Sequence, residues 1–262
     1  MAHGAAYGTA YGTALSATGP DRLGLGVPGY AHPLLAPAEW AALTRPGAPL
    51  HWAVLNVADG PGTRPDPHCL EAAGRLRNAG VKVLGHLDLG HGARPFEELV
   101  SDAQRYVDWY RVDGFLLDRC PADRAHLADV RRMAATLEVL LDHADGGHLV
   151  LGHGGHPHPG YARIAGQLVT FSGSWADYRW SQAAQWTAAH PPERFVHLVH
   201  GVPRTHLDEA LRIARWQGAG TIFFTDQAED RSAGRAGQTS PFAALPGYWD
   251  EIVSRIGPGV SE

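Results

Sequence analysis

Short apolar runs alternate with amphipathic segments along most of the chain. The apolar runs, rich in Val, Leu and aromatic residues, are typical of buried strands. The predicted strands cover residues 23–27, 51–56, 81–87, 112–117, 148–151, 168–171, 195–200 and 221–225. The predicted helices cover residues 67–78, 96–110, 123–143, 176–188 and 207–216. Strands that alternate with helices indicate βαβ units and a parallel sheet. Eight such units predict the α/β class and a closed (β/α)8 TIM barrel.

The length agrees with one barrel rather than two domains. The chain has 262 residues, and a barrel of this kind needs about 250. No internal stretch has the composition of a linker, so we assign residues 21–258 to a single barrel. Residues 1–20 contain the repeat AYGTAYGT and lack a periodic apolar pattern, which predicts a disordered N-terminal tail.

Charge and cysteine content narrow the classes of partner. The net charge is -5 and no run of Lys or Arg occurs, which argues against nucleic acid as a partner. No segment has the roughly 18 consecutive apolar residues of a membrane span, and the N-terminus does not read as a signal peptide. The two cysteines, Cys69 and Cys120, do not form a disulfide framework, so we expect a cytoplasmic protein.

Polar side chains stand at the carboxyl ends of the third and fourth predicted strands. Side chains alternate between the faces of a strand, so His86 and Asp88 share a face with Leu84, and Asp118 shares one with Leu116. The carboxyl ends of the strands are where α/β barrels place their catalytic residues. We therefore expect these three polar side chains at the mouth of the barrel. The alternative is a hydrogen-bonded polar plug that caps the core.

Several short motifs lie in a fixed order along the chain. They are VPGY at 27–30, Asn56 with GPG at 60–62, VLG at 83–85 with Gly92 and Arg94, Tyr106 with Trp109 and Tyr110, VDG at 112–114 with Asp118, Thr225 with Asp226, and LPGYW at 245–249. Together they resemble the spherulin-4 family, spherulation-specific family 4, over residues 23–256. Members of that family include secreted microbial glycosidases that act on galactosamine-containing polysaccharides. The resemblance implies a (β/α)8 barrel with an acidic cleft at the strand ends and no metal.

The chain departs from the family at the positions that carry hydrolysis. The resemblance implies an Asp-Glu pair after the fourth strand and a Glu after the sixth. Asp118 matches the Asp, but Arg119 stands at the Glu position and Ser172 at the second Glu. His86 and His91 replace family tyrosines, and GHG at 152–154 replaces Asn-Pro-Gly.

These replacements bear directly on the chemistry. Glycoside hydrolysis needs two carboxyl groups, one protonated and one ionised. A serine cannot supply the anion, and Arg119 beside Asp118 is expected to keep that carboxyl ionised. Asp59, Asp88 and Asp226 are the carboxylates near strand ends that are candidates for a relocated partner.

Histidine is unusually frequent, with sixteen residues. His86 and His91 are candidate proton carriers because imidazole titrates near neutral pH. His153, His156 and His158 cluster after the fifth strand, but their spacing matches no metal motif, so we expect an ordinary loop and neither metal nor cofactor. Cys120 reads as an ordinary thiol.

The sequence leads to one main hypothesis. The catalytic candidates are Asp118, His86, Asp88 and Arg119. Substrate-binding candidates are Tyr30, Asn56, Asp59, His91, Arg94, His153, Ser172, Trp175, His200 and Asp226. We expect a cytoplasmic, cofactor-independent enzyme that performs acid–base chemistry, such as cyclisation, elimination, isomerisation or a glycosyl rearrangement, on a small polar metabolite. The alternatives are a glycosidase for galactosamine-containing polysaccharide and a catalytically inactive carbohydrate-binding barrel.

Overall fold

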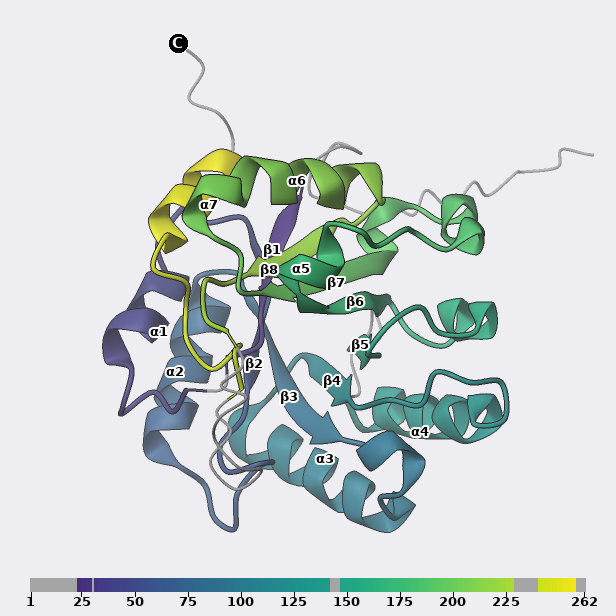
Figure 1. The fold of residues 1–262 in the computed structure, drawn as a ribbon. Coiled ribbons are helices and arrows are strands. Elements are labelled where there is room, and N and C mark those ends of the chain that lie inside the picture. The colour runs from purple at the N-terminus through teal and green to yellow at the C-terminus, as the bar shows by residue number, and fades with distance from the viewer. Residues whose placement is uncertain (1–22, 30, 142–146, 229–239, 258–262) are drawn as a thin grey trace, which may run out of the picture.

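The computed structural model describes residues 23–29, 31–141, 147–228 and 240–257. Within them eight parallel strands close into a barrel in chain order (Figure 1). The strands are β1 (Gly24–Val27), β2 (Leu50–Leu55), β3 (Lys82–Asp88), β4 (Gly114–Asp118), β5 (His148–Gly152), β6 (Gln167–Ser174), β7 (Phe195–His200) and β8 (Thr221–Phe224). The predicted (β/α)8 fold is confirmed. Each predicted strand matches an observed one, within three residues at either end.

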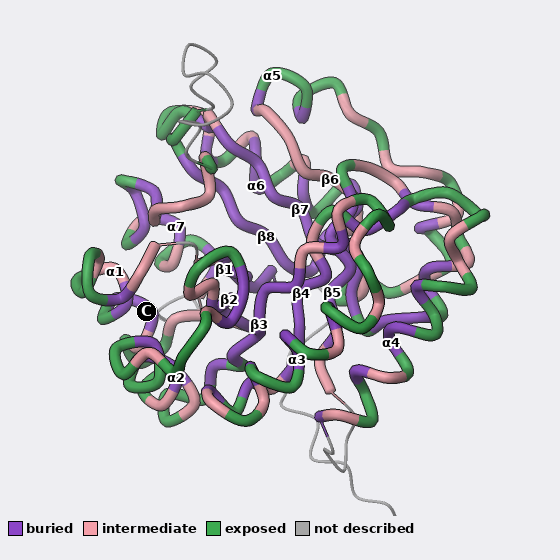
Figure 2. Tube along the Cα trace, turned by 90° about the horizontal axis from the view of Figure 1, so that it is seen from below, coloured by how far each residue is buried: buried purple, intermediate pink, exposed green. Residues whose placement is uncertain are grey.

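Helices surround the barrel (Figure 2). They are α1 (Pro37–Leu43), α2 (Pro67–Asn78), α3 (Phe96–Tyr110), α4 (Leu127–Leu141), the single turn α5 (Trp175–Tyr178), α6 (Leu207–Trp216) and α7 (Trp249–Ile256). Short 3-10 turns are η1 (Gly90–Gly92), η2 (Pro159–Arg163), η3 (Gln185–Ala189), η4 (Pro192–Arg194) and η5 (Arg204–His206). No helix in these described ranges has the length and apolar character to span a membrane.

The predicted helix over residues 176–188 is wrong. Helix α5 ends after one turn, and η3 follows only after an extended stretch at residues 182–184. The Ser181 side chain donates to the Tyr178 carbonyl (2.8 Å), and the Ser181 carbonyl accepts from Gln217 (3.1 Å). A serine that bonds the preceding backbone competes with helix formation. The local bond of Ser181 and its tertiary bond with Gln217 together replace the preference for helix in this segment.

Packing contacts define which strand residues face inward. On β3 a Cβ at Gly85 would lie 2.8 Å from the ring of Tyr106 in α3, so Gly85 faces the helices. Phe115 of β4 packs on the same ring. Alternation then turns His86, Asp88 and Asp118 toward the barrel axis, as the sequence predicts.

A hydrogen-bonded polar network fills the amino-terminal end of the barrel. Gln167 of β6 accepts a hydrogen bond from the Trp52 indole (2.8 Å), and its amide donates to the Thr221 hydroxyl (3.0 Å). His148 and His51 extend the network, at 3.2 Å from Gln167 and 2.9 Å from Thr221. Burial lowers the pKa of His148 to about 4. The polar residues at this end are thus satisfied by one another, and the candidate site lies at the opposite end.

Candidate active site at the mouth of the barrel

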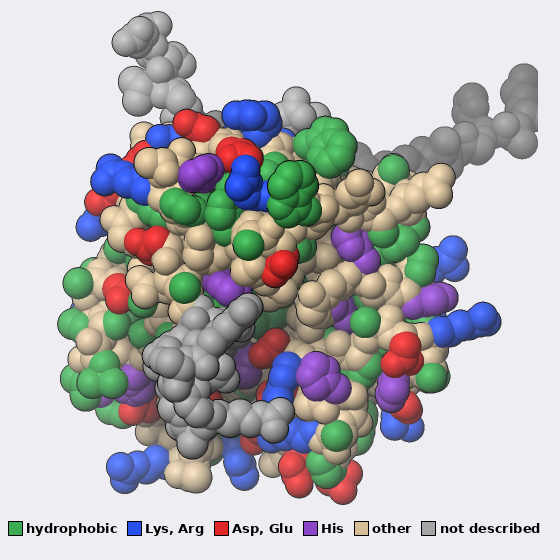
Figure 3. Space-filling view, in the orientation of Figure 1, with side chains coloured by type: hydrophobic (Ala, Val, Ile, Leu, Met, Phe, Trp, Pro, Cys, Tyr) green, Lys and Arg blue, Asp and Glu red, His purple; other side chains and the backbone are tan. Residues whose placement is uncertain are grey.

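The ends of β3 and β4 lie in register. Asp88 is the direct neighbour of Asp118 across the two strands, and the backbone pairing continues beyond both ends. Leu89 N–H donates to the Asp118 carbonyl (2.9 Å) and His91 N–H to the Arg119 carbonyl (2.8 Å). This pairing fixes two carboxylates side by side at the mouth. Figure 3 shows acidic, basic and histidine side chains gathered around a hollow on this face.

The Asp118 carboxylate is accessible to solvent, and each of its two oxygens has a hydrogen-bond partner in the protein. Its side chain is 36% exposed, whereas that of His86 is only 8% exposed. His86 Nε2 lies 3.3 Å from Asp118 Oδ2, and Arg119 N–H donates to Asp118 Oδ1 over 2.8 Å. An ionised carboxylate can only accept hydrogen bonds, so His86 Nε2 is the donor. Two donors from the protein therefore orient a solvent-accessible carboxylate.

Asp88 is tied to Arg119. The guanidinium binds both carboxylate oxygens, with Nε 2.7 Å from Oδ1 and Nη2 on Oδ2, and Gly90 N–H donates to Oδ1 over 2.8 Å. Burial opposes ionisation, but the bonds from Arg119 and Gly90 outweigh it and lower the pKa of Asp88. The hydrogen bonds that Arg119 donates to Asp88 likewise raise the pKa of Arg119. The sequence led us to expect the Arg119 side chain beside Asp118, whereas its ionic contact is with Asp88.

Backbone strain concentrates at this end of the barrel. In the described ranges, four non-glycine residues have positive φ, and three of them follow consecutive strands: Asp59 at 51°, His91 at 57° and Arg119 at 47°. The fourth, Arg111, ends helix α3. Such conformations are costly and cluster at functional sites. The left-handed turn at Arg119 accompanies the return of its side chain toward β3.

Gly152, at the end of β5, leaves room for Asp118. A Cβ at Gly152 would lie 3.2 Å from both Asp118 Cα and Asp118 Oδ1. Cys120 N–H donates to the Gly152 carbonyl (2.9 Å), so the two segments cannot easily separate. Sequence reasoning did not identify Gly152 as a site residue, although a glycine at a strand end is a sign of close approach.

Two further candidates face the mouth from β6 and β7. Phe171 packs outward on Tyr178, so alternation turns Ser172 inward, and Ser174 pairs in register with His200. His200 is buried and its ring lies edge-on to Phe242. The position that carries a Glu in the family pattern therefore presents a hydroxyl to the mouth.

Several candidates from the loops have local partners. Asn56 accepts from Gly60 N–H (2.9 Å), and Asp226 accepts from Gly247 N–H (3.1 Å). Arg94 pairs with Asp102 of helix α3. These contacts organise the loops after β2, β8 and β3. Asp59 and His91 are exposed on their turns, and Tyr30 lies outside the described residues, as does the predicted tail, residues 1–20.

The three histidines of the loop after β5, His153, His156 and His158, each contact a different part of the backbone. His153 is buried with Nδ1 3.2 Å from the Cys120 carbonyl, and burial lowers its pKa to about 4. His156 accepts from Ala184 N–H (3.1 Å) and His158 from Gly160 N–H (3.1 Å). Each ring is thus engaged with a different backbone segment.

Two other candidates are enclosed by the protein. The Trp175 indole is buried against Tyr178, His206 and Arg179, which leaves little of it open to a sugar ring. Cys120 is also buried, and burial, followed by the charge of Asp118, raises the pKa of its thiol to about 12. Cys120 therefore has the character of an inert thiol, as the sequence predicts.

Comparisons with known proteins identify relatives of this barrel. The model of spherulation-specific family 4 matches residues 25–256. Spherulin-4 of Physarum polycephalum is 24% identical over 179 residues, which cover 68% of this chain and 52% of the relative, so the match spans about half the relative's length. The structure of Aspergillus clavatus Sph3 in complex with GalNAc superposes with a TM-score of 0.75 at 22% identity, covering 90% of this chain and 98% of Sph3. The Bacillus cereus spore cortex-lytic enzyme SleL gives a TM-score of 0.54 at 8% identity, covering 89% and 74%.

Proposed function

The chain belongs to spherulation-specific family 4, and from that premise we propose an enzyme that performs acid–base chemistry on a small, polar, carbohydrate-like molecule without two-carboxylate hydrolysis. The observation that carries the proposal is the pairing at the mouth: His86 with Asp118, and Arg119 with Asp88. One carboxylate is accessible and the other is neutralised by a guanidinium. We further propose that the reaction takes place in the cytoplasm, which the two free thiols support.

Asp118 is the proposed general base. Its carboxylate receives hydrogen bonds from His86 Nε2 and Arg119 N–H, so it is oriented and can accept a proton from an acidic C–H or O–H of the substrate. His86 holds the carboxylate in the substrate-free site and supports the return of the proton to the product. A base and a neighbouring proton carrier suit elimination, cyclisation or isomerisation.

Arg119 is the proposed anchor for substrate oxygens. A guanidinium carries five N–H donors, and Asp88 engages those on Nε and Nη2. Among the described residues, Arg119 forms its ion pair with Asp88. About half of the Arg119 side chain remains exposed to solvent. Its remaining donors can bind a carboxylate, phosphate or developing oxyanion.

The same ion pair argues against ordinary glycoside hydrolysis. That reaction needs one carboxyl group that is protonated at the working pH. The lowered pKa of Asp88 keeps it ionised, and the position of the second family carboxylate is Ser172. Asp118 is then the single candidate for both roles among β3, β4 and β6.

The test is a mass-resolved activity screen. Purified protein is incubated with a polar metabolite extract and, separately, with galactosamine-containing oligosaccharides. We expect products with unchanged mass or with loss of water, which are absent for Asp118→Asn. Asp250→Asn, on the outer helix α7, is the matched control and should behave as wild type. Products that survive Asp118→Asn, or turnover that only adds water to oligosaccharides, would contradict the proposal.

A true glycosidase is the second candidate. Asp88 and Asp118 are register partners on adjacent strands, which lie about 4.8 Å apart, and retaining glycosidases use carboxyl groups about 5–5.5 Å apart. The reaction would require Arg119 to leave Asp88 when the substrate binds. Release of reducing ends from galactosamine-rich polysaccharide, lost in Asp118→Asn, would establish it. Sugar binding without any turnover would favour an inactive carbohydrate-binding barrel.

A further inference from the structure

A second cluster of reactive side chains lies away from the proposed active-site pairs, between the loop after β1 and the start of α2. It consists of His32, Asp66 and Cys69, whose ligand atoms all lie within 4.8 Å of one another. Cys69 is buried, while the side chains of His32 and Asp66 are 23% and 28% exposed. The cluster therefore has one buried ligand, Cys69, and two ligands that solvent can reach.

All three groups converge on one point. His32 Nε2 lies 3.4 Å from Asp66 Oδ2 and 3.6 Å from Cys69 Sγ. A catalytic Cys-His-Asp arrangement would use the two opposite ring nitrogens, but here one nitrogen faces both partners. For tetrahedral zinc, ordinary bond lengths give about 3.4 Å between nitrogen and oxygen ligands and about 3.6 Å between nitrogen and sulfur ligands. Both observed separations match these values.

The fold holds the ligands in place. Asp66 Oδ1 caps helix α2 by accepting from Cys69 N–H (3.0 Å), which leaves Oδ2 to face His32. Asp66 N–H donates to the Tyr110 hydroxyl (3.0 Å), and that hydroxyl donates to the Pro61 carbonyl (3.2 Å). Residues that orient metal ligands in this way are part of a working metal site.

From this geometry we propose that His32, Asp66 and Cys69 bind a zinc-class divalent cation with a fourth, open position. A thiolate and an imidazole select zinc or cobalt over magnesium or calcium. The cation would join the loop after β1 to helix α2. The site uses none of the residues of the proposed reaction, so either proposal can fail alone.

Cation binding would change the protonation of two of the three ligands. The negative charge of Asp66 attracts a cation, which displaces the thiol proton of Cys69 when it binds. Leu34 N–H donates to His32 Nδ1 (3.2 Å), so the ring hydrogen is on Nε2. Cation binding moves that hydrogen to Nδ1, at the cost of one exposed hydrogen bond.

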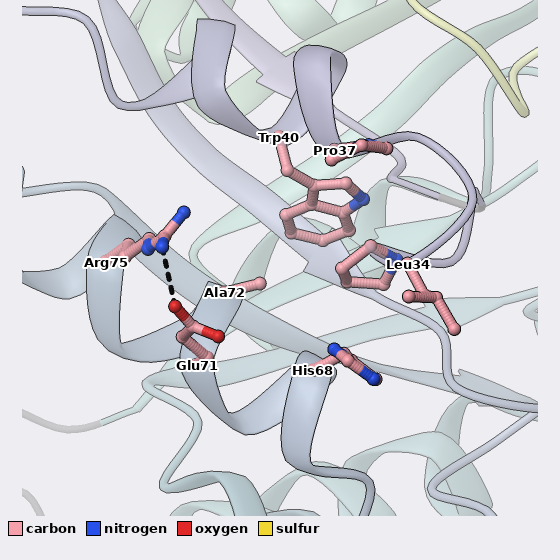
Figure 4. A pocket seen from close by; sticks show the side chains of 8 residues that line it. Leu34, Pro37, Trp40, His68, Glu71, Ala72 and Arg75 are labelled. Atoms are coloured by element: carbon pink, nitrogen blue, oxygen red, sulfur yellow. Dashed lines mark hydrogen bonds and ion pairs between the residues drawn. The ribbon is translucent and has the colours of Figure 1, made fainter.

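A pocket of about 270 Å³ between α1 and α2 is lined by Pro33 and His68, which flank His32 and Cys69 in the sequence. Figure 4 shows Leu34 and His68 at one end of this pocket and the Glu71–Arg75 pair at the other. The rings of His68 and His32 lie 6.3 Å apart. None of the three proposed ligands lines this pocket, so it is adjacent to the cluster and not part of the site.

Cobalt titration of the full chain tests the site. We expect one cobalt per chain with a thiolate-to-cobalt charge-transfer band, and displacement by zinc. Cys69→Ser should remove the band, and Asp66→Asn, which keeps a capping side chain, should weaken binding at least tenfold. Cys120→Ser is the matched control, because it removes the other cysteine, and should leave the band unchanged.

Two outcomes of the titration would contradict the proposed site. No charge-transfer band at a large excess of cobalt, or a band that Cys120→Ser removes, would overturn the proposal. If Cys69→Ser does not fold, zinc-dependent thermal stabilisation of wild type and of Asp66→Asn decides the matter. Equal stabilisation of the two proteins would also refute the site.

Discussion

Replacing Arg119 tests how the mouth of the barrel is organised without knowledge of the substrate. Arg119→Gln removes both bonds to Asp88 and leaves that carboxylate with Gly90 N–H. Because the Arg119 side chain is 53% exposed and that of Asp88 is 26% exposed, solvent screens the pair strongly. We expect a loss of about 1 kcal/mol in unfolding free energy, near the upper end for exposed pairs.

Arg119→Gly separates the ion pair from the strain. The backbone φ of 47° at this position costs a non-glycine residue about 1–2 kcal/mol. Glutamine retains that strain, whereas glycine relieves it. The glycine variant should therefore be about as stable as wild type, and clearly more stable than Arg119→Gln.

The effect of Arg119→Gln should depend on pH. The pKa of Asp88 is lowered in the folded protein, so its stabilisation is present above the unfolded value of about 3.9 and is lost as pH falls through the folded value. Urea unfolding at about pH 7 and about pH 3 measures this. Arg132→Gln, in an exposed pair on α4, is the control. Equal stability of wild type and Arg119→Gln at both pH values, or equal losses for the glutamine and glycine variants, would refute the reasoning.

Three further predictions concern the rest of the barrel. Gly152→Ala places a methyl group 3.2 Å from Asp118 Oδ1 and should lower turnover about tenfold; steady-state kinetics that show full turnover would contradict this. Gln167→Ala leaves buried partners unpaired and should cost about 2–4 kcal/mol in urea unfolding, whereas a loss under about 1 kcal/mol would argue against the network. His148 and His197, whose pKa values burial lowers to about 4 and about 3, stay neutral while the unfolded chain takes up protons below its ordinary value of about 6.5. Stability should therefore fall from about pH 6.5 to about pH 4, by up to about 1.4 kcal/mol per pH unit for each histidine; a flat profile from urea melts would contradict it.

Periodicity was sufficient for the barrel because each strand and long helix carries its own apolar pattern. The predicted strand at 195–200 and helices at 67–78, 96–110 and 207–216 have the observed bounds. The prediction for segment 176–188 failed in part because Gln217 donates hydrogen bonds to the carbonyl and the hydroxyl of Ser181, a tertiary contact that no local pattern records.

In the candidate site, local sequence patterns likewise predicted the direction of the strand side chains but not the long-range contacts. Alternation along β3 and β4 turned His86, Asp88 and Asp118 inward, as the packing on Tyr106 shows. The partner of Arg119 depends on a left-handed backbone angle, and Arg119 carries no sequence signal for that angle. The cluster around His32 joins two segments that are 34 residues apart in sequence (from position 32 to position 66). The spacing of these residues along the chain therefore did not predict that they lie together.

We propose that one carboxylate at the mouth of the barrel performs the chemistry while the neighbouring carboxylate is neutralised by Arg119. It is tested most directly by comparing turnover of Asp118→Asn and Asp88→Asn on a compound that the wild-type protein converts. We predict that Asp118→Asn loses about 10²–10⁴-fold in turnover, the usual contribution of a general base, and that Asp88→Asn loses less than about tenfold, because Asp88 positions Arg119 and transfers no proton. Equal losses in the two variants would show that both carboxylates act in the reaction and would contradict the claim.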